Sequence, residues 1–214
     1  MKRRFWVLPP LWVWVLFCFS MALSATAYVT TREGLRFVSR KLQPTERRVV
    51  LTALQAWDEL TDGQSASTTR KLRVMLQENR LRSMHGLSFA RPRERSTFGY
   101  TDERDRILLN PRLCFGSMVW RDKKRVHDYD LVVTLSTLVH EDQHYSRNAG
   151  EREAYRVEWL FLRQALKVAR QRGLSYAESL ALWEEQTSLR IGETLGEEQA
   201  RRLAEELNLT ANRP

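Results

Sequence analysis

One stretch decides how this chain is organised: Leu131-Val132-Val133-Thr134-Leu135-Ser136-Thr137-Leu138-Val139-His140-Glu141-Asp142-Gln143-His144. Its apolar residues recur with a helical period, and together they predict a buried helix that begins near Asp128 or Asp130, either of which can cap it. The stretch ends in the pattern H-E-x-x-H. Because residues four apart lie on one face of a helix, both histidines can direct an imidazole nitrogen at a single metal ion.

The glutamate between the histidines has a different position. Glu141 lies one step around the helix, so we expect it to act as a general base on a metal-activated water and to pass the proton to a leaving amine. The competing interpretation is an ordinary helix whose histidines face solvent or are satisfied within the core. A buried apolar helix disfavours that interpretation, because a histidine pair inside it needs a polar partner.

A third ligand is expected shortly after the histidines. Residues 146–150 form a predicted turn, and a long helix is expected from Glu151 to Arg172. Folding back after the turn brings a carboxylate near the histidines, and both Glu151 and Glu153 qualify by their distance along the chain. Glu153 also suits a solvated place in the first turn, where it complements the helix dipole. Ala154 is small enough to allow close approach of the two helices.

These residues resemble the zincin metallopeptidases. The resemblance rests on His140-Glu141-Asp142-Gln143-His144 followed by Glu151-Arg152-Glu153-Ala154-Tyr155, which is similar to the E-x-x-A motif that supplies the third zinc ligand in several glutamate-zincin families. It implies Zn²⁺ as the cofactor, His140, His144 and Glu151 as its ligands and Glu141 as the catalytic base, with Glu153 as a reserve ligand. Those families often carry Asp or Asn at the position of Tyr155.

Two strands are predicted before the histidine helix. Residues 96–101 and 106–111 have strand character and are separated by a polar turn, which predicts a β-hairpin. In zincins an edge strand lies beside the active-site helix and binds the substrate backbone. The segment Ile107-Leu108-Leu109-Asn110 is similar in position and character, although an ordinary strand covering the helix fits it equally well.

An enzyme of this kind also needs a group that stabilises the oxyanion formed from the substrate carbonyl. Tyr155 is the candidate oxyanion helper, and Tyr145, Tyr129 and His127 are alternatives. The sequence does not rank them, because each residue type more often has a place in a core or on a surface.

The rest of the chain is mainly helical in pattern. We predict helices over Thr45–Leu60 and Thr68–Met84, a further short strand over Leu87–Ala90, a helix after the capping box at residues 175–178, and a last helix with an apolar stripe over Ala200–Leu207. The predicted fold class is α+β, mostly helical, with an active-site helix, a small sheet containing the hairpin and C-terminal helices. The resemblance implies that this is a zincin-like domain.

The first 27 residues have a composition of their own. Basic residues at 2–4 precede an apolar run over 11–19, and small residues follow up to Ala27, which is typical of a secretory signal peptide. An uncleaved membrane anchor is the alternative. We therefore expect an exported protein, periplasmic or secreted or anchored to the membrane by this segment. Residues 28–214 are expected to form a single zincin-like metallopeptidase domain.

Composition limits the remaining classes. The 214 residues carry 35 basic and 26 acidic residues, a net charge of +9, and removal of residues 1–27 takes away three basic and no acidic residues, which leaves +6. Cys114 is then the only cysteine, so an intrachain disulfide is excluded. Basic runs at 91–95 and 121–125 predict at most an association with the membrane surface or an anionic envelope polymer. No nucleic-acid partner is expected.

Together these observations predict an exported zinc metallopeptidase, a hydrolase acting on a peptide or protein substrate through a metal-activated water. A non-catalytic zincin-like module with an envelope-binding or structural role is the alternative. A purely helical envelope-binding protein is a third class of function that the sequence allows.

Overall fold

The computed structural model describes residues 28–30, 36–85, 97–102, 104–116 and 126–211. Most of these residues are helical. The helices are α2 (Pro44–Leu60), α3 (Ala66–Gln77), α5 (Pro111–Cys114), α7 (Asp128–Arg147), α8 (Glu151–Arg172), α9 (Ala177–Leu195) and α10 (Glu197–Ala211). This composition confirms the α+β, mostly helical class.

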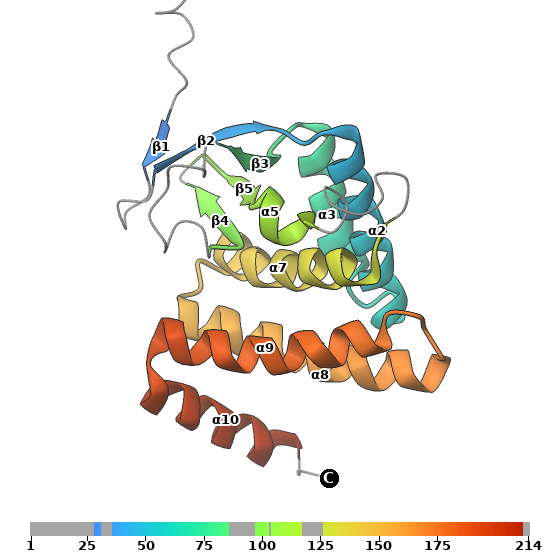
Figure 1. Cartoon of the computed structure of the whole chain (residues 1–214), viewed down its shortest axis with the longest axis vertical. Helices are drawn as coiled ribbons and strands as arrows, with labels where there is room; N and C mark the ends of the chain where they lie inside the picture. The colour runs from blue at the N-terminus through green and yellow to red at the C-terminus, as the bar shows by residue number, and fades with distance from the viewer. Residues whose placement is uncertain (1–27, 31–35, 86–96, 103, 117–125, 212–214) are drawn as a thin grey trace, which may run out of the picture.

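A small mixed sheet forms the upper layer in Figure 1. Its strands are β1 (Tyr28–Thr30), β2 (Arg36–Lys41), β3 (Leu81–His85), β4 (Gly99–Asp102) and β5 (Arg106–Leu109). They are ordered β1-β2-β3-β5-β4. All neighbouring strands are antiparallel except β3 and β5, which are parallel. The sheet packs on α7 through β4 and β5.

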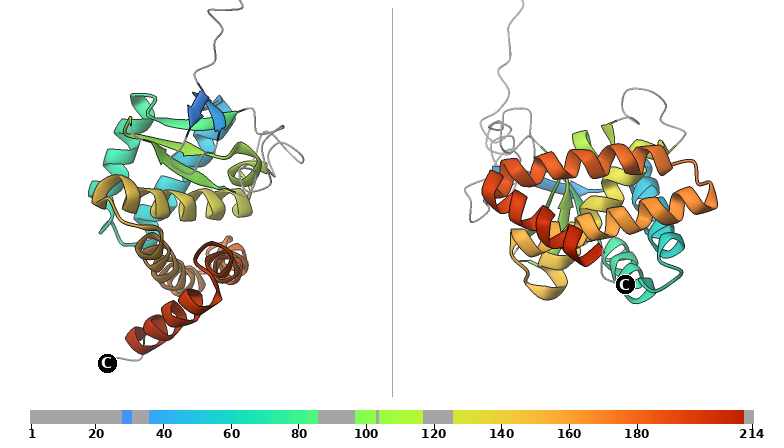
Figure 2. Two further views of the ribbon diagram at one scale, coloured as in Figure 1. Left: turned by 90° about the vertical axis from the view of Figure 1, so that its left-hand side faces the viewer. Right: turned by 90° about the horizontal axis from the view of Figure 1, so that it is seen from below.

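The helix α7 lies at the centre of the molecule. Every residue from Asp130 to Gln143 is buried, as the apolar sequence of this helix predicted. The sheet lies on one side of α7 and the pair α8 and α9 on the other, with α10 outermost (Figures 1 and 2). The apolar face of α2, which includes Val50, Leu54 and Trp57, packs against α7 in the main core.

A second, smaller core holds the C-terminal helix. Leu203 and Leu207 of α10 are buried against Ile191 of α9 and against Tyr155 and Trp159 of α8. An ion pair of 2.7 Å between Arg152 and Glu206 joins α10 to the first turn of α8. The C-terminal helix therefore supports the part of α8 that follows the histidine helix.

The hairpin predicted around residues 96–111 is confirmed, since β4 and β5 pair as antiparallel neighbours. The helix predicted over Thr68–Met84 is wrong in its second half. The helix α3 ends at Gln77, Asn79 has a left-handed backbone with φ of 56°, and the chain continues as β3. The apolar residues after the turn fit a strand because β3 pairs with both β2 and β5.

The predicted start of α7 near Asp128 is confirmed, but two predicted caps need correction. His127, not Asp128 or Asp130, occupies the N-cap position of α7, and no side chain caps it. The helix α9 likewise begins after Tyr176, without the predicted capping box. Tyr176, which occupies the N-cap position of α9, is buried in the main core.

Three predicted features lie outside the described residues: the strand Leu87–Ala90, the two basic runs and the signal or anchor segment 1–27. Among the residues that the structure describes, none of the helices combines the length and the apolar character that a bilayer-spanning segment requires.

Candidate metal centre

Three predicted ligands meet at the junction of α7 and α8. The chain leaves α7 at Asn148, whose φ of 50° is left-handed, and enters α8 at Glu151. This tight reversal places the carboxylate of Glu151 beside His140 and His144. The ligand atoms of the three side chains lie within 4.8 Å of one another, and within the described chain they are the only such cluster of His, Cys, Asp and Glu.

The distances within this cluster suit a common metal ion. The Nε2 atoms of His140 and His144 are 3.1 Å apart. Glu151 places one carboxylate oxygen 3.3 Å from Nε2 of His140 and the other 3.5 Å from Nε2 of His144. Ligands held at 2.0–2.1 Å in a tetrahedron are about 3.3 Å apart. The three groups therefore fit a tetrahedral divalent ion with a fourth position open.

Hydrogen bonds on the far side of each imidazole decide which nitrogen faces the cluster. Nδ1 of His144 donates to the carbonyl oxygen of Ala149 at 2.7 Å, and Nδ1 of His140 lies 3.0 Å from a carboxylate oxygen of Glu158. Both Nδ1 atoms therefore carry the proton, and in the neutral rings both Nε2 lone pairs point into the same small space. Either a metal ion or a proton on one of the two Nε2 atoms satisfies this arrangement, because two facing lone pairs repel each other.

The charges around His140 favour a positive group at this position. Burial alone lowers the pKa of His140, but hydrogen bonds with Glu151 and Glu158 outweigh it and raise this pKa to about 10. The same carboxylates can stabilise a metal ion in place of the proton.

Glu158 is a functional candidate that sequence reasoning missed. It is 0% exposed and lies on α8, where it receives a hydrogen bond from Ser136 in addition to its contact with His140. A carboxylate that orients a ligating histidine is a regular part of metal sites. Its signal was present in the sequence, because Glu151, Ala154 and Glu158 share one face of a helix otherwise rich in apolar residues.

A buried arginine, Arg190, neutralises the charge of Glu158. Arg190 of α9 forms an ion pair of 3.3 Å with Glu158 and lies over the rings of Phe98 and Trp183. Burial alone raises the pKa of Glu158, but Arg190 and then His140 lower it below the ordinary value, so this residue is a carboxylate. Helices α7, α8 and α9 thus each contribute one member of the series His140, Glu158 and Arg190.

Glu141 lies beside the cluster and is held by the edge of the sheet. Thr101 of β4 donates a hydrogen bond of 2.9 Å to a carboxylate oxygen of Glu141. A Cβ atom at Gly99 would lie 2.5 Å from the other carboxylate oxygen and 2.7 Å from a methyl carbon of Thr137. Glycine is therefore what allows β4 to approach this carboxylate. Burial raises the pKa of Glu141, against the opposing charges of His140 and His144, which suits a proton acceptor.

The order of the strands contradicts the expectation that the segment Ile107–Asn110 forms the edge strand. Ile107, Leu108 and Leu109 belong to β5, which lies between β3 and β4, and all three side chains are buried there. An apolar strand of this kind gains most from an interior place. The strand at the edge of the described sheet, beside α7, is β4.

The reserve ligand lies outside the cluster. Glu153 forms a paired contact with Arg156 at 2.7 and 2.8 Å and does not join the histidines. Its carboxylate has the solvated helix position that was the alternative expectation.

Tyr155, the predicted oxyanion helper, makes other contacts in the structure. The ring of Tyr155 packs against His140 with 4.6 Å between centroids, while its hydroxyl hydrogen-bonds Thr194 at 3.1 Å. The ring, not the hydroxyl, thus faces the histidine.

The three alternatives lie in other surroundings. Tyr145 accepts a hydrogen bond from Arg80, and Tyr129 donates one to Gln186. His127 occupies the N-cap position at the far end of α7, where its side chain makes no capping hydrogen bond. None of these contacts involves the three clustered ligands.

Comparison of the chain with family models, with curated proteins and with solved structures found no match. The geometry of the site therefore carries the functional argument by itself. Fold and site together describe an α+β protein with a candidate His-His-Glu metal centre.

Proposed function

We propose that the protein is an exported zinc metallopeptidase with a zincin-like domain. The observation that carries the proposal is the meeting of His140, His144 and Glu151 at tetrahedral spacing, with the carboxylate of Glu141 beside them and outside the ligand set. Two histidines and a glutamate with a fourth position open are the ligand set of catalytic rather than structural zinc. The signal-like segment 1–27 supports the export part of the proposal.

His140, His144 and Glu151 would hold the zinc ion, which when bound would acidify a water and polarise the scissile carbonyl. Glu141 accepts the proton from that water, and its raised pKa favours this exchange. Thr101 fixes one oxygen of this carboxylate by a hydrogen bond of 2.9 Å. Once the oxygen of that water has bonded to the carbonyl carbon, Glu141 would deliver the proton to the leaving amine as the peptide C–N bond breaks.

In this proposal the edge strand β4 binds the backbone of the substrate. A peptide can pair with the outer edge of β4 as an additional strand, and Gly99 and Thr101 then place its backbone next to Glu141. The same strand thus orients both the base and the substrate.

Peptide hydrolysis by the zinc-loaded full-length protein tests the proposal. We expect the wild type to cleave members of an unbiased peptide library, and Glu141→Gln to lose roughly 10²- to 10⁴-fold in rate while it still binds one zinc. Glu153→Gln is the matched control, since Glu153 lies on the neighbouring helix and pairs with Arg156.

The outcomes separate the function classes. Zinc bound without any hydrolysis supports the non-catalytic zincin-like module instead. A wild type that binds no zinc, or a Glu141→Gln variant with full activity, contradicts the enzyme.

A further inference from the structure

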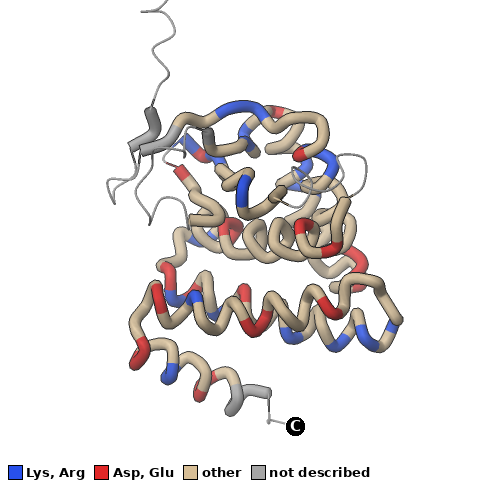
Figure 3. Tube along the Cα trace, in the orientation of Figure 1, with Lys and Arg blue, Asp and Glu red and all other residues tan. Residues whose placement is uncertain are grey.

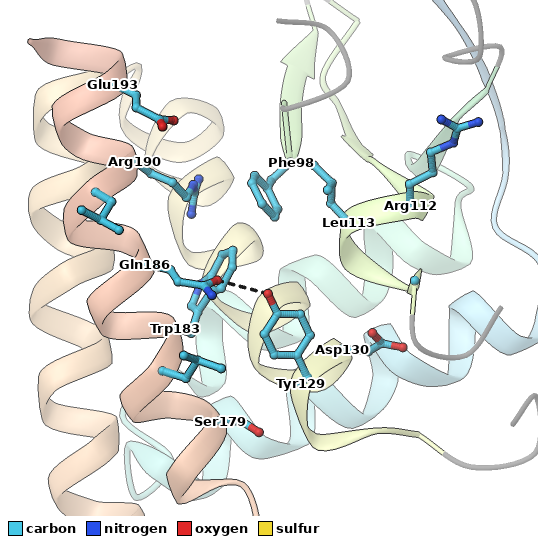
Figure 4. Close-up of a pocket in the computed structure, with 13 residues that line it drawn as sticks. Phe98, Arg112, Leu113, Tyr129, Asp130, Ser179, Trp183, Gln186, Arg190 and Glu193 are labelled. Carbon is cyan, nitrogen blue, oxygen red and sulfur yellow. Dashed lines mark hydrogen bonds between the residues drawn. The ribbon is translucent and has the colours of Figure 1, made fainter. Parts of the chain in front are cut away.

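A pocket of about 810 Å³ is lined by none of the three candidate ligands, but it reaches Phe98 and Arg190, which neighbour the surroundings of the site. Helix α9 forms one wall, α5 and Phe98 form the facing wall, and Tyr129 and Asp130 at the start of α7 close one end (Figure 4). Neither the proposed chemistry nor the ligand set uses this space.

Two residues connect the pocket to the site. Arg190 lines the pocket and pairs with Glu158, the carboxylate that holds His140. Phe98 also lines it and directly precedes Gly99, which contacts Glu141. A peptide paired with β4 near Glu141 therefore has this pocket within reach of a neighbouring side chain.

The lining is mainly apolar. Six large apolar side chains contribute to it: Phe98, Leu113, Tyr129, Leu182, Trp183 and Leu189. Leu182 and Leu189 are 47% and 66% exposed, and they are two of the four exposed large apolar residues among those described. Exposed apolar side chains gathered at a pocket beside a reactive site are typical of ligand binding.

The charged groups of the pocket do not select a charged ligand. Arg112 and Arg190 stand against Asp130 and Glu193, so the formal charges cancel. Arg190 is in addition paired with Glu158 and covered by aromatic rings. An apolar group consequently gains more in this pocket than an acidic or basic one.

We propose that this pocket receives a large apolar side chain, aromatic or branched aliphatic, of the peptide whose scissile bond lies over the His140, His144 and Glu151 cluster. The inference rests on the proposed function and adds its substrate class: peptides with such a residue near the cleaved bond.

Binding to the zinc-loaded Glu141→Gln protein tests the pocket without turnover. The probes are fluorescein-labelled peptides of Gly and Ser that differ at one central residue, which is Phe, Leu, Ala, Asp or Lys. We expect the Phe and Leu peptides to bind roughly tenfold or more tightly than the Ala peptide, because burial of a large side chain is favourable. The Asp and Lys peptides should bind no better than Ala.

Substitutions in the pocket test whether the preference for the Phe and Leu peptides arises there. Leu189→Asp and Leu182→Asp, each introduced into the Glu141→Gln protein, should remove the preference for Phe and Leu. Leu51→Asp is the matched control, because Leu51 is 42% exposed on α2 and does not line the pocket. Both pocket positions are exposed, so these variants should keep the fold, which a melting curve checks.

The outcomes also separate this inference from the proposed function. Equal binding of all peptides, or a preference that survives both pocket variants, overturns the pocket. Cleavage by the wild type without an apolar preference overturns the pocket and leaves the peptidase intact. A preference in binding without any cleavage supports the pocket and contradicts the peptidase.

Discussion

Glu158 shows that the geometry of the candidate metal centre also depends on residues that are not themselves ligands. It is two helical turns beyond Glu151, fully buried, and joined to His140, Ser136 and Arg190. The glutamate-zincin motif that this sequence resembles often has Asp or Asn at the position of Tyr155. In this chain the ring of Tyr155 packs on His140, and the orienting carboxylate comes from one turn further along α8.

Replacement of this carboxylate tests its orienting role. We expect Glu158→Gln to weaken zinc binding roughly 10- to 100-fold, because the amide cannot hold the Nδ1 proton of His140 as well as a carboxylate does. A competition titration with a chromogenic chelator measures the affinity. Glu153→Gln should bind zinc as the wild type does, and equal affinities for all three proteins would show that Glu158 is only structural.

Gly99 offers a test of the contact between β4 and Glu141. A methyl group at this position meets Glu141 and Thr137 at less than van der Waals distance. We expect Gly99→Ala to cost about 1–3 kcal/mol of stability and to reduce peptide hydrolysis, while zinc affinity is unchanged. Denaturant unfolding and hydrolysis rates measure the two effects.

The matched glycine is Gly192, whose added methyl would meet nothing within 4 Å and which does not line the pocket. Gly192→Ala should therefore leave stability and hydrolysis near the wild-type values. An active and stable Gly99→Ala protein would show that β4 does not lie against the base.

Among the elements, α7 and the α7–α8 junction could be predicted because their signals are local. The histidine pair is four residues apart on a buried helix, and Glu151 follows after a six-residue connection. Arg190 could not be found in this way, since its contact with Glu158 depends on how α9 packs across α8. Periodicity also failed at Asn79, where one left-handed residue separates a helix from a strand.

The short helix α5 can be tested through its cysteine. Cys114 is fully buried, and burial raises the pKa of its thiol to about 12. Because the thiolate is the reactive form, we expect native Cys114 to resist iodoacetamide and to react fully in denaturant. Mass spectrometry of the peptide that contains Cys114 distinguishes it from Cys18. Equal labelling rates in native and denatured protein would contradict the packing of α5 on α7.

At the scale of the whole molecule, the sequence predicted the fold class but not the order of the strands in the sheet. The mixed order of the sheet, with β5 inside and β4 at the edge, follows from long-range pairing that strand patterns do not encode. Figure 3 places basic residues along β2 and near the C-terminal end of α8, with acidic residues interspersed among the C-terminal helices. Association with an anionic envelope polymer stays a prediction, because both basic runs lie outside the described residues.

Metal removal should affect the whole fold, because the centre joins α7 to α8. We expect saturating zinc to raise the melting temperature by about 5–10 °C over the chelated protein, which corresponds to roughly 2.7 kcal/mol at a concentration 100-fold above Kd. Calorimetry with and without a chelator measures the shift. His144→Ala should abolish it, and an equal shift in that variant would place the metal elsewhere.

Zinc-edge X-ray absorption of the zinc-loaded full-length protein tests the central claim most directly. The account predicts a four-coordinate ion with two imidazole nitrogens and carboxylate oxygen at about 2.0–2.2 Å, and the loss of one imidazole in His144→Ala. A sulfur ligand at about 2.3 Å, or a spectrum that His144→Ala leaves unchanged, would contradict a centre built from His140, His144 and Glu151.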